Sequence, residues 1–237
     1  TLGQMEHFNS GGWKDFTKCT TYICNYPVTA SALYQFTNNC NDTCGNYNGT
    51  PNNLEPYTAS GKYGKGAVFN GTNSNIELAS TLPGQTGATA FSWSIWFYAN
   101  GAQSTYSLIL DTEYGSSPYN GVGMGIIGST STVSAFAGGT TNPGNMAYSG
   151  NTYTANVWNH LVLTYDGSGV MKLYLNNVEV GSGSNVTVNT GLSIYVGSRR
   201  AVSSWHYFKG TLDQLRIFDS ALTSTQITEL YNEVYCP

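Results

Sequence analysis

Two carboxylates lie close enough together in the sequence to suggest acid–base chemistry. Asp111 and Glu113 are separated by one residue, so in a β-strand both side chains point to the same face. Glycoside hydrolysis uses a pair of acids, one as general acid and the other as base or nucleophile. The segment Asp111-Thr112-Glu113 is therefore the nearest approach to a glycosidase site in this chain, and it is incomplete as it stands.

Other catalytic patterns are absent from the sequence. No serine stands in a G-x-S-x-G elbow, and His160 has no second histidine placed to form a ligand pair. We expect His160 to be a hydrogen-bonded packing residue. The run Gly121-Val122-Gly123-Met124-Gly125 is not followed by a helix start, so it predicts a strand with close backbone approach rather than a phosphate cradle.

Five cysteines offer redox chemistry or cross-links. The disulfide candidates Cys19, Cys24, Cys40 and Cys44 gather in the first 44 residues, and Cys236 lies near the end of the sequence. Their spacings match no common zinc pattern. Local disulfides are expected in a protein found outside the cell. The odd number leaves one thiol free or paired with another chain, and the alternative is that all five are reduced.

Aromatic residues are abundant, with eighteen Tyr, five Trp and nine Phe. Flat rings stack on sugars and also anchor protein interfaces. Trp93 and Trp158 are expected to pack between sheets. The aromatic and histidine residues in predicted loops are candidates for a glycan or partner surface, with plain packing as the alternative. These ligand-binding candidates are Tyr114, Tyr119, Tyr148, Tyr153, Trp205, His206 and Tyr207.

Composition narrows the class of protein. The 237 residues suit one large all-β domain, 40% are apolar, and only 9% are charged. The net charge is -4 and the only adjacent basic pair is Arg199-Arg200, which argues against nucleic-acid binding because phosphates need several cations. No apolar run approaches the ~20 residues of a membrane span.

Hydrophobic alternation predicts many short strands separated by Gly, Asn, Ser and Thr. The clearest is 91–98, where Phe91, Trp93, Ile95 and Phe97 share one face, and Ser92, Ser94, Trp96 and Tyr98 share the other. Asn176-Asn177 predicts a tight hairpin turn because Asn tolerates positive φ. The other expected strands are 32–36, 67–69, 75–78, 106–111, 121–128, 132–137, 158–165, 170–176, 178–181, 192–197 and 210–218.

Non-strand segments are expected at three places. Residues 138–150 are predicted to be a loop rich in Gly, Asn and Thr. Thr223 and Gln226 have capping-box spacing, and a short helix is predicted near 224–232. Residues 1–29 lack a steady period and are expected to form an irregular, cysteine-containing arm or linker, which leaves 30–237 as the sandwich domain.

Several segments in order resemble a known family. They are Leu33-Tyr34-Gln35-Phe36, Gly64-Lys65-Gly66-Ala67-Val68-Phe69-Asn70-Gly71, Phe91-Ser92-Trp93-Ser94-Ile95-Trp96-Phe97, Trp158-Asn159-His160-Leu161-Val162-Leu163-Thr164-Tyr165-Asp166-Gly167 and Gly210-Thr211-Leu212-Asp213-Gln214-Leu215-Arg216-Ile217-Phe218. The set resembles laminin-G-like domains of the concanavalin-A-like lectin/glucanase superfamily, of the kind found in phage fibre and bacterial surface proteins. This resemblance implies an all-β, two-sheet antiparallel jelly roll with a concave face and one short C-terminal helix. Glucanases of the superfamily carry three acids on one strand, a run that this sequence lacks.

The resemblance also implies a structural Ca²⁺. Alternation places Asp213 with Leu215 and Ile217 on a core-facing side, where a charge needs a partner. In domains that 210–218 resembles, the matching Asp binds Ca²⁺ with backbone carbonyls, for which Gly71 is the expected donor. The strand near 35–37 is a further source of carbonyls, and Asp42 is a further candidate ligand. The alternative is that Asp213 caps a turn through backbone N–H groups.

These observations leave three functions open. The first is a non-enzymatic surface module that binds a cell-surface glycan or a protein partner. The second is a structural domain for capsid or fibre assembly, and the third is a glycoside hydrolase. We expect no enzymatic activity, an extracellular or virion-surface location, and display as an oligomer or array.

Overall fold

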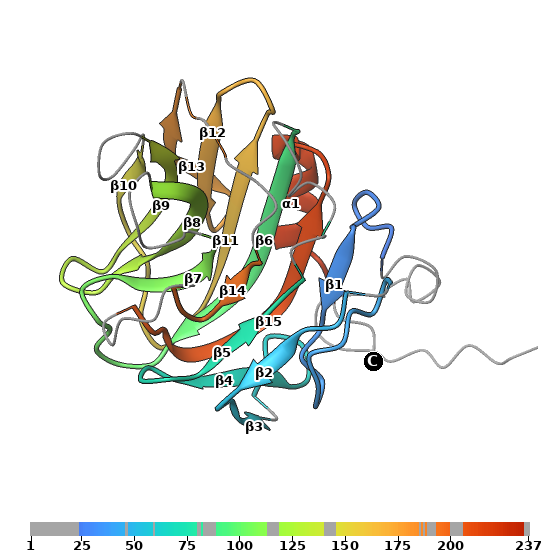
Figure 1. Cartoon of the computed structure of the whole chain (residues 1–237), viewed down its shortest axis with the longest axis vertical. Helices are drawn as coiled ribbons and strands as arrows, with labels where there is room; N and C mark the ends of the chain where they lie inside the picture. The colour runs from blue at the N-terminus through green and yellow to red at the C-terminus, as the bar shows by residue number, and fades with distance from the viewer. Residues whose placement is uncertain are drawn as a thin grey trace, which may run out of the picture.

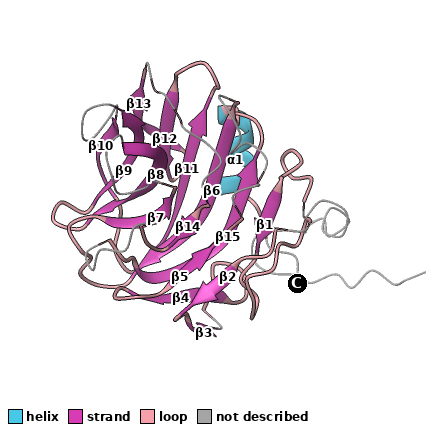
Figure 2. Cartoon of the chain, in the orientation of Figure 1, coloured by secondary structure: helices cyan, strands magenta, loops and turns pink. Residues whose placement is uncertain are grey.

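Two antiparallel β-sheets dominate the computed structural model, which describes residues 24–45, 47–58, 60–79, 82, 89–112, 119–139, 146–184, 186, 188, 193–199 and 206–234 (Figures 1 and 2). One sheet has eight strands, the other has seven, and one short helix follows within the described residues. The predicted all-β sandwich is confirmed.

The eight-stranded sheet supplies most of the long strands. Its order is β13 (Val178–Gly183), β12 (Met171–Leu175), β11 (Trp158–Tyr165), β6 (Phe91–Ala99), β15 (Lys209–Phe218), β4 (Gly66–Asn70) and β3 (Glu55–Thr58), and β1 (Ala32–Tyr34) also pairs with β15. β6 and β11 pair over eight consecutive residues, from Trp158 opposite Tyr98 to Tyr165 opposite Phe91. This long, regular pairing fixes the centre of the sheet.

The seven-stranded sheet is built around a meander. Its order is β10 (Met146–Thr152), β9 (Thr132–Gly139), β8 (Tyr119–Ile127), β7 (Ser107–Asp111), β14 (Tyr195–Val196), β5 (Asn75–Glu77) and β2 (Thr50–Asn52). The expected loop 138–150 is therefore wrong in its second half, since β10 begins at Met146 and pairs with β9. Small and polar residues hid this strand because one face of an antiparallel sheet can be solvated. β2 and β3 were also not predicted.

The core lies between the two sheets. Phe91, Trp93, Ile95 and Phe97 of β6 are completely buried in it, as the alternation predicts. The hairpin between β12 and β13 has φ angles of 49° and 68° at Asn176 and Asn177, which confirms the predicted turn.

The helix α1 (Ser224–Tyr231) covers part of the outer face of the eight-stranded sheet, beside β6 and β15 in Figure 1. The predicted capping box is present, because Thr223 accepts the N–H of Gln226 and the Gln226 side chain accepts the N–H of Thr223. Ile227 and Leu230 pack in a second buried cluster with Phe218 of β15. This cluster is where α1 contacts the outer face of the eight-stranded sheet.

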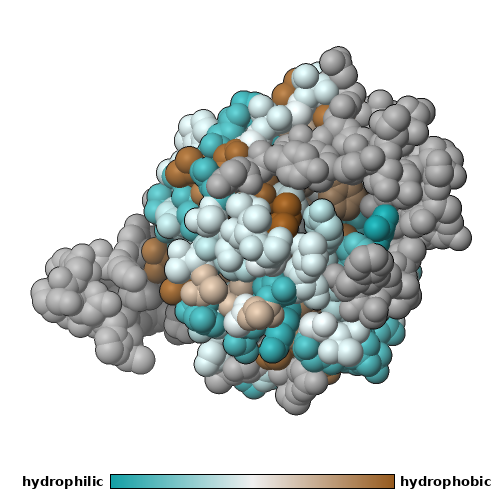
Figure 3. Space-filling view, turned by 90° about the vertical axis from the view of Figure 1, so that its left-hand side faces the viewer, coloured by the Kyte–Doolittle hydropathy of each residue, from teal (hydrophilic) through white to brown (hydrophobic). Residues whose placement is uncertain are grey.

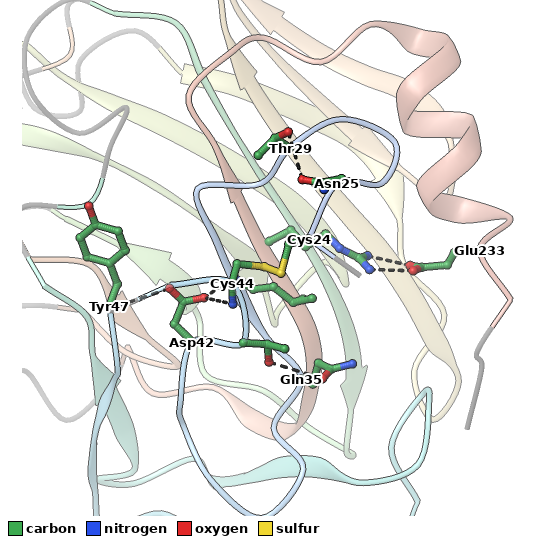
Figure 4. The surroundings of a disulfide bond; sticks show 11 residues. Cys24, Asn25, Thr29, Gln35, Asp42, Cys44, Tyr47 and Glu233 are labelled. Carbon is green, nitrogen blue, oxygen red and sulfur yellow. Dashed lines mark hydrogen bonds and ion pairs between the residues drawn. A yellow bond between two sulfur atoms is a disulfide. The ribbon is translucent and has the colours of Figure 1, made fainter. Parts of the chain in front are cut away.

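The segment from Cys24 to Ala30 lies against the sandwich. The hydroxyl of Tyr26 donates to the carbonyl of Glu229, and Tyr26 packs against the cluster under α1. A disulfide joins Cys24 to Cys44 (Figure 4). Residues 24–29 of the expected arm are thus tied to the domain, while residues 1–23 lie outside the described part.

Of the other cysteines, Cys40 is free and buried, with its Sγ 2.9 Å from the hydroxyl oxygen of Tyr57. Two of the four disulfide candidates are therefore paired with each other. Cys19 and Cys236 lie outside the described residues.

Candidate functional site

Two residues of the predicted aromatic surface are buried instead. Tyr153 and Tyr207 are each 6% exposed. Tyr153 packs edge-to-face on Phe97 of the core, and Tyr207 forms an isolated parallel bridge with Leu108 beside β7. Both were assigned to exposed loops because they fall between strands, but the loops fold back onto the sandwich.

The structure describes some of the remaining candidates and not others. Tyr119 and Tyr148 lie in β8 and β10, where the backbone is described. Tyr114 and Trp205 lie outside the described residues. Only His206 among the seven candidates has a described, partly exposed side chain.

His206 forms a stacked pair with Tyr106, which the sequence reasoning placed at the start of a strand and did not single out as a site residue. The two ring centroids lie 6.5 Å apart with an interplanar angle of 22°. Tyr106 is 49% exposed and is the only exposed aromatic residue in the described part of the chain. We call this pair the rim pair. Its best signal in the sequence is that Tyr106 immediately precedes the buried strand β7.

Hydrogen bonds fix the two segments that carry the rim pair. The N–H of Leu108 donates to the carbonyl of His206 over 3.1 Å. The side chain of Gln103 donates to the carbonyl of Lys209 at 2.7 Å and accepts the N–H of Lys209 at 3.1 Å. The rim pair therefore stands at the start of β7, an inner strand of the seven-stranded sheet, on backbone that is held from both sides.

Burial lowers the pKa of His206, and the nearby charge of Arg199 lowers it further. His206 is therefore neutral at neutral pH, because even its ordinary pKa is ~6.5. The rim pair accordingly offers flat rings and hydrogen-bonding atoms rather than a cation.

Asp111, the first half of the possible acid pair, lies on the face of the seven-stranded sheet that points away from the core. It pairs in register with Tyr195 of β14 and Gly123 of β8, and it is fully buried. Glu113 lies outside the described residues. A fully buried carboxylate cannot contact a glycosidic bond in this conformation.

The glycines of β8 make room for neighbouring side chains and backbone. A Cβ on Gly123 would lie 2.3 Å from the ring of Phe136, and one on Gly125 would lie 2.4 Å from the carbonyl oxygen of Ser107. The predicted strand with close backbone approach is confirmed, and the close neighbours belong to the chain itself.

The expected calcium ligands do not come together. Asp213 is buried on the outer face of the eight-stranded sheet, opposite Trp96, because a bulge at Gln214 (φ 50°) shifts the alternation of β15. The prediction that Asp213 shares a face with Leu215 and Ile217 is therefore wrong. Its carboxylate accepts the N–H groups of Tyr63 (2.8 Å) and Gln214 (2.7 Å), as the capping alternative predicts.

Gly71 lies too far from Asp213 to share an ion with it. β4 and β15 pair with Asn70 opposite Lys209 and Ala67 opposite Leu212, so the position facing Gly71 is five residues from Asp213. At ~3.3 Å per residue the separation is about 16 Å, whereas oxygens around one Ca²⁺ lie within about 5 Å of each other.

The Asp42 carboxylate also accepts hydrogen bonds from backbone N–H groups. It accepts the N–H groups of Leu33 (2.9 Å), Cys44 (2.9 Å) and Tyr47 (3.4 Å) (Figure 4). Within the described residues no three His, Cys, Asp or Glu side chains gather as a metal site. The expected ligand set therefore does not fit calcium, and calcium binding elsewhere in the chain stays a prediction.

His160 is a buried packing residue, as expected. Its Nε2 lies 2.8 Å from the Ser94 hydroxyl, and its ring stacks on Trp96 with centroids 4.8 Å apart. Burial, with a smaller contribution from Arg216, lowers the pKa of His160 to about 3, so the ring is neutral. This serine–histidine contact is closed off beneath Trp96.

The side on the left of Figure 1, seen face-on in Figure 3, is mostly hydrophilic with separate hydrophobic patches among the coloured residues, unlike a large apolar interface. No helix in the described residues is long and apolar enough to cross a membrane.

Comparison with known proteins supplies the family. The model of a laminin-G family described as the concanavalin A-like lectin/glucanases superfamily matches residues 70–228. No curated protein matches. Domain 4 of AbnA, an extracellular GH43 arabinanase from Geobacillus stearothermophilus solved in complex with arabinotriose, is 27% identical with a TM-score of 0.68, and the match covers 86% of this chain and 98% of that domain.

Binding domains of botulinum neurotoxins are similar in fold. The serotype D/C binding domain is 15% identical with a TM-score of 0.67, and the match covers 86% of this chain but 51% of the toxin domain. The serotype D ligand-binding domain solved with N-acetylneuraminic acid is 15% identical with a TM-score of 0.66 over 85% of this chain and 50% of that one. With two sheets, a capped terminal helix and a family match over more than half its length, the chain belongs to the concanavalin A-like lectin/glucanases superfamily.

Proposed function

We propose that this chain is a non-catalytic carbohydrate-binding module whose contact surface includes the rim pair, Tyr106 and His206. The observation that carries the proposal is the 49% exposure of Tyr106, whose ring lies nearly parallel to a neutral His206. An exposed aromatic ring held by its neighbours offers a flat apolar face to the C–H groups of a sugar, while the Tyr106 hydroxyl bonds to its hydroxyls.

The similar domain of the arabinanase supports a carbohydrate ligand, because it was solved with arabinotriose and matches over nearly its full length. The toxin binding domains share only the fold, and this chain spans about half their length.

Three features support binding without turnover. Asp111 is fully buried, the Ser94–His160 contact is covered by Trp96, and the rim pair, a tyrosine and a histidine, contains no carboxyl group. A glycosidase needs two carboxyl groups that flank an accessible bond.

The Cys24–Cys44 disulfide is compatible with a location outside the reducing cytosol. One small site gives modest affinity because few contacts offset the lost freedom of the ligand. We therefore expect the module to be displayed in several copies on a cell or virion surface, where avidity compensates.

A glycan array tests the proposal with wild-type protein and a Tyr106→Ala/His206→Ala variant. Wild type should bind at least one class of glycan, in competition with the free sugar, and the variant should bind at least tenfold more weakly, the loss of an aromatic anchor. Tyr106→Phe should retain most binding because the ring face remains.

Val178→Ala is the matched control, because Val178 is 57% exposed on β13 and lies outside the rim. A double variant that binds like wild type would exclude the rim pair. A blank array from a protein that forms stable homo-oligomers would favour an assembly domain, and release of reducing sugar ends with turnover would show an enzyme.

A further inference from the structure

The outer face of the eight-stranded sheet carries a second aromatic pair, Tyr98 of β6 and Trp158 of β11. The two residues are direct cross-strand partners, and their ring centroids lie 5.8 Å apart at an interplanar angle of 61°. Both are partly exposed. We call this pair the sheet-face pair.

The sheet-face pair lies beyond the area that α1 covers. The helix reaches the next row of the same face, where Tyr231 stacks on Trp96 with centroids 5.7 Å apart. In the row of the sheet-face pair, Tyr98 is also opposite Thr211, and Thr211 is opposite Val68. All four residues of this row are partly exposed, so the row forms one continuous accessible strip across β11, β6, β15 and β4.

The polar atoms of the sheet-face pair are available. Within the described residues, neither the Tyr98 hydroxyl nor the Trp158 indole N–H has a hydrogen-bond partner in the protein. Val157, which directly precedes Trp158 in the sequence, is 44% exposed. Aromatic rings that face outward on a sheet, with no covering element among the described residues, are typical of a contact surface.

The backbone that presents Trp158 is fixed in advance. Buried Asn159 donates through its side chain to the carbonyls of Thr154 and Val157 over 2.8 and 3.0 Å. Its side-chain oxygen accepts the side-chain N–H of Asn176 at 3.1 Å. A platform held this firmly loses little conformational entropy when a ligand binds.

The groups around the sheet-face pair favour a neutral ligand. The nearest described carboxylate in the adjoining row, Asp213, is buried and bonded to backbone N–H groups. The ammonium of Lys62 is engaged over Trp96. Lys209, two residues before Thr211 on β15, is an exposed cation in the row on the other side. The rings and the Thr211 hydroxyl beside this single cation suit the C–H faces and hydroxyls of a neutral sugar chain.

We infer that the Tyr98–Trp158 sheet-face pair is a second, independent binding site for a neutral glycan, on a different surface from the rim pair. The inference shares a ligand class with the proposed function but uses other residues. A single domain with two such sites binds two glycan chains, or two stretches of one polymer, without forming an oligomer.

Affinity electrophoresis tests this through native gels cast with arabinan, xylan, mannan, galactan or mixed-linkage β-glucan. Four proteins are compared: wild type, the rim variant Tyr106→Ala/His206→Ala, the sheet-face variant Tyr98→Ala/Trp158→Ala, and the combination of both. In at least one gel, each double variant should retain part of the retardation and the combined variant should lose it. Each double variant should bind several-fold more weakly than wild type, in line with aromatic anchors.

The experiment can contradict either proposed site without contradicting the other. If the sheet-face variant migrates like wild type in every gel, the second site is wrong and the rim pair stands alone. If the rim variant migrates like wild type and the sheet-face variant loses all retardation, the rim proposal is wrong and the second site is the real one. Wild-type protein that is retarded in no gel contradicts the second site.

Misfolding is separated from lost binding by conservative changes. Trp158→Phe and Tyr98→Phe keep ring faces and should keep most retardation with unchanged near-UV circular dichroism, and Val178→Ala on the same sheet should behave like wild type. If wild type instead forms dimers as its concentration rises and the sheet-face variant does not, the surface is a contact between copies and the glycan site is excluded.

Discussion

The ammonium nitrogen of Lys62 lies 3.8 Å from the centroid of the Trp96 ring. Trp96 in turn stacks on His160 and Tyr231, so the contact joins the 60–65 loop, the sheet and α1. A cation over an indole ring is attracted by the negative potential of the ring face. This stack fixes the outer face of the sheet next to the sheet-face pair.

Lys62→Ala should lower the free energy of unfolding by about 1 kcal/mol, the magnitude of a partly desolvated cation–π contact. Urea unfolding followed by Trp fluorescence measures the change. Lys65→Ala is the matched control, because Lys65 reaches only the exposed side chain of Asn38 and should cost under about 0.5 kcal/mol. Equal losses in both variants would contradict a specific role for the ring contact.

Because Asp213 is buried, the free energy of unfolding should fall as the pH rises. Burial raises the pKa of Asp213 to about 7, although hydrogen bonds from the backbone of Tyr63, Gln214 and Lys62 oppose the shift. Between the unfolded value near 4 and the folded value the native state holds one more proton, so the free energy of unfolding decreases from about pH 4 to pH 7. Its contribution is fully present below pH 4.

Asp213→Asn should flatten that decrease, because the amide does not titrate. Thermal melts of both proteins at pH 4, 5.5, 7 and 8 measure the slope. Parallel curves for the two proteins across this range would show that Asp213 does not titrate there, and that its backbone hydrogen bonds outweigh its burial.

Cys24→Ser/Cys44→Ser should reduce stability by about 3 kcal/mol, because the disulfide spans 20 residues and restricts the unfolded chain. Guanidinium unfolding under non-reducing conditions measures the loss. Adding a reductant should weaken wild type to the level of the variant and leave the variant unchanged. A variant as stable as wild type would mean that Tyr26 and the packing under α1 suffice to hold the segment.

Asn177→Gly should be tolerated or slightly stabilising, since Gly adopts the φ of 68° without steric cost. Asn177→Val should cost about 1–2 kcal/mol because a β-branched residue is strained there. Both variants lose the bond from the Thr228 hydroxyl to Asn177, so the loss of that bond does not contribute to the difference between them. Calorimetric melting of the pair tests it.

Local patterns in the sequence determined much of the fold. The alternation in β6 identified its buried face, the Thr223–Gln226 spacing identified the start of α1, and Asn176-Asn177 identified a turn. Each of these features depends on neighbours within a few residues, because strand alternation, helix capping and turn conformation are local preferences of the chain.

The tertiary structure decided which of the chemically suitable residues reach the surface. One extra residue at the Gln214 bulge moved Asp213 to the opposite face from Leu215 and Ile217, and no alternation pattern announces a bulge. The register of β4 against β15 places Gly71 five residues away from Asp213. Tyr153 was assigned to a loop, yet the loop folds back onto the core. Exposure depends on what packs above a residue, and those partners come from distant parts of the sequence.

Both proposed sites also depend on contacts between distant parts of the sequence. Tyr106 meets His206 across 100 positions of the sequence, and Tyr98 meets Trp158 across 60. The sequence supplied the rings and the strands that carry them. The pairing of β6 with β11, and the closure of the segment before β15 onto β7, brought each pair together, because strand neighbours in a sandwich are chosen by long-range packing rather than by local sequence.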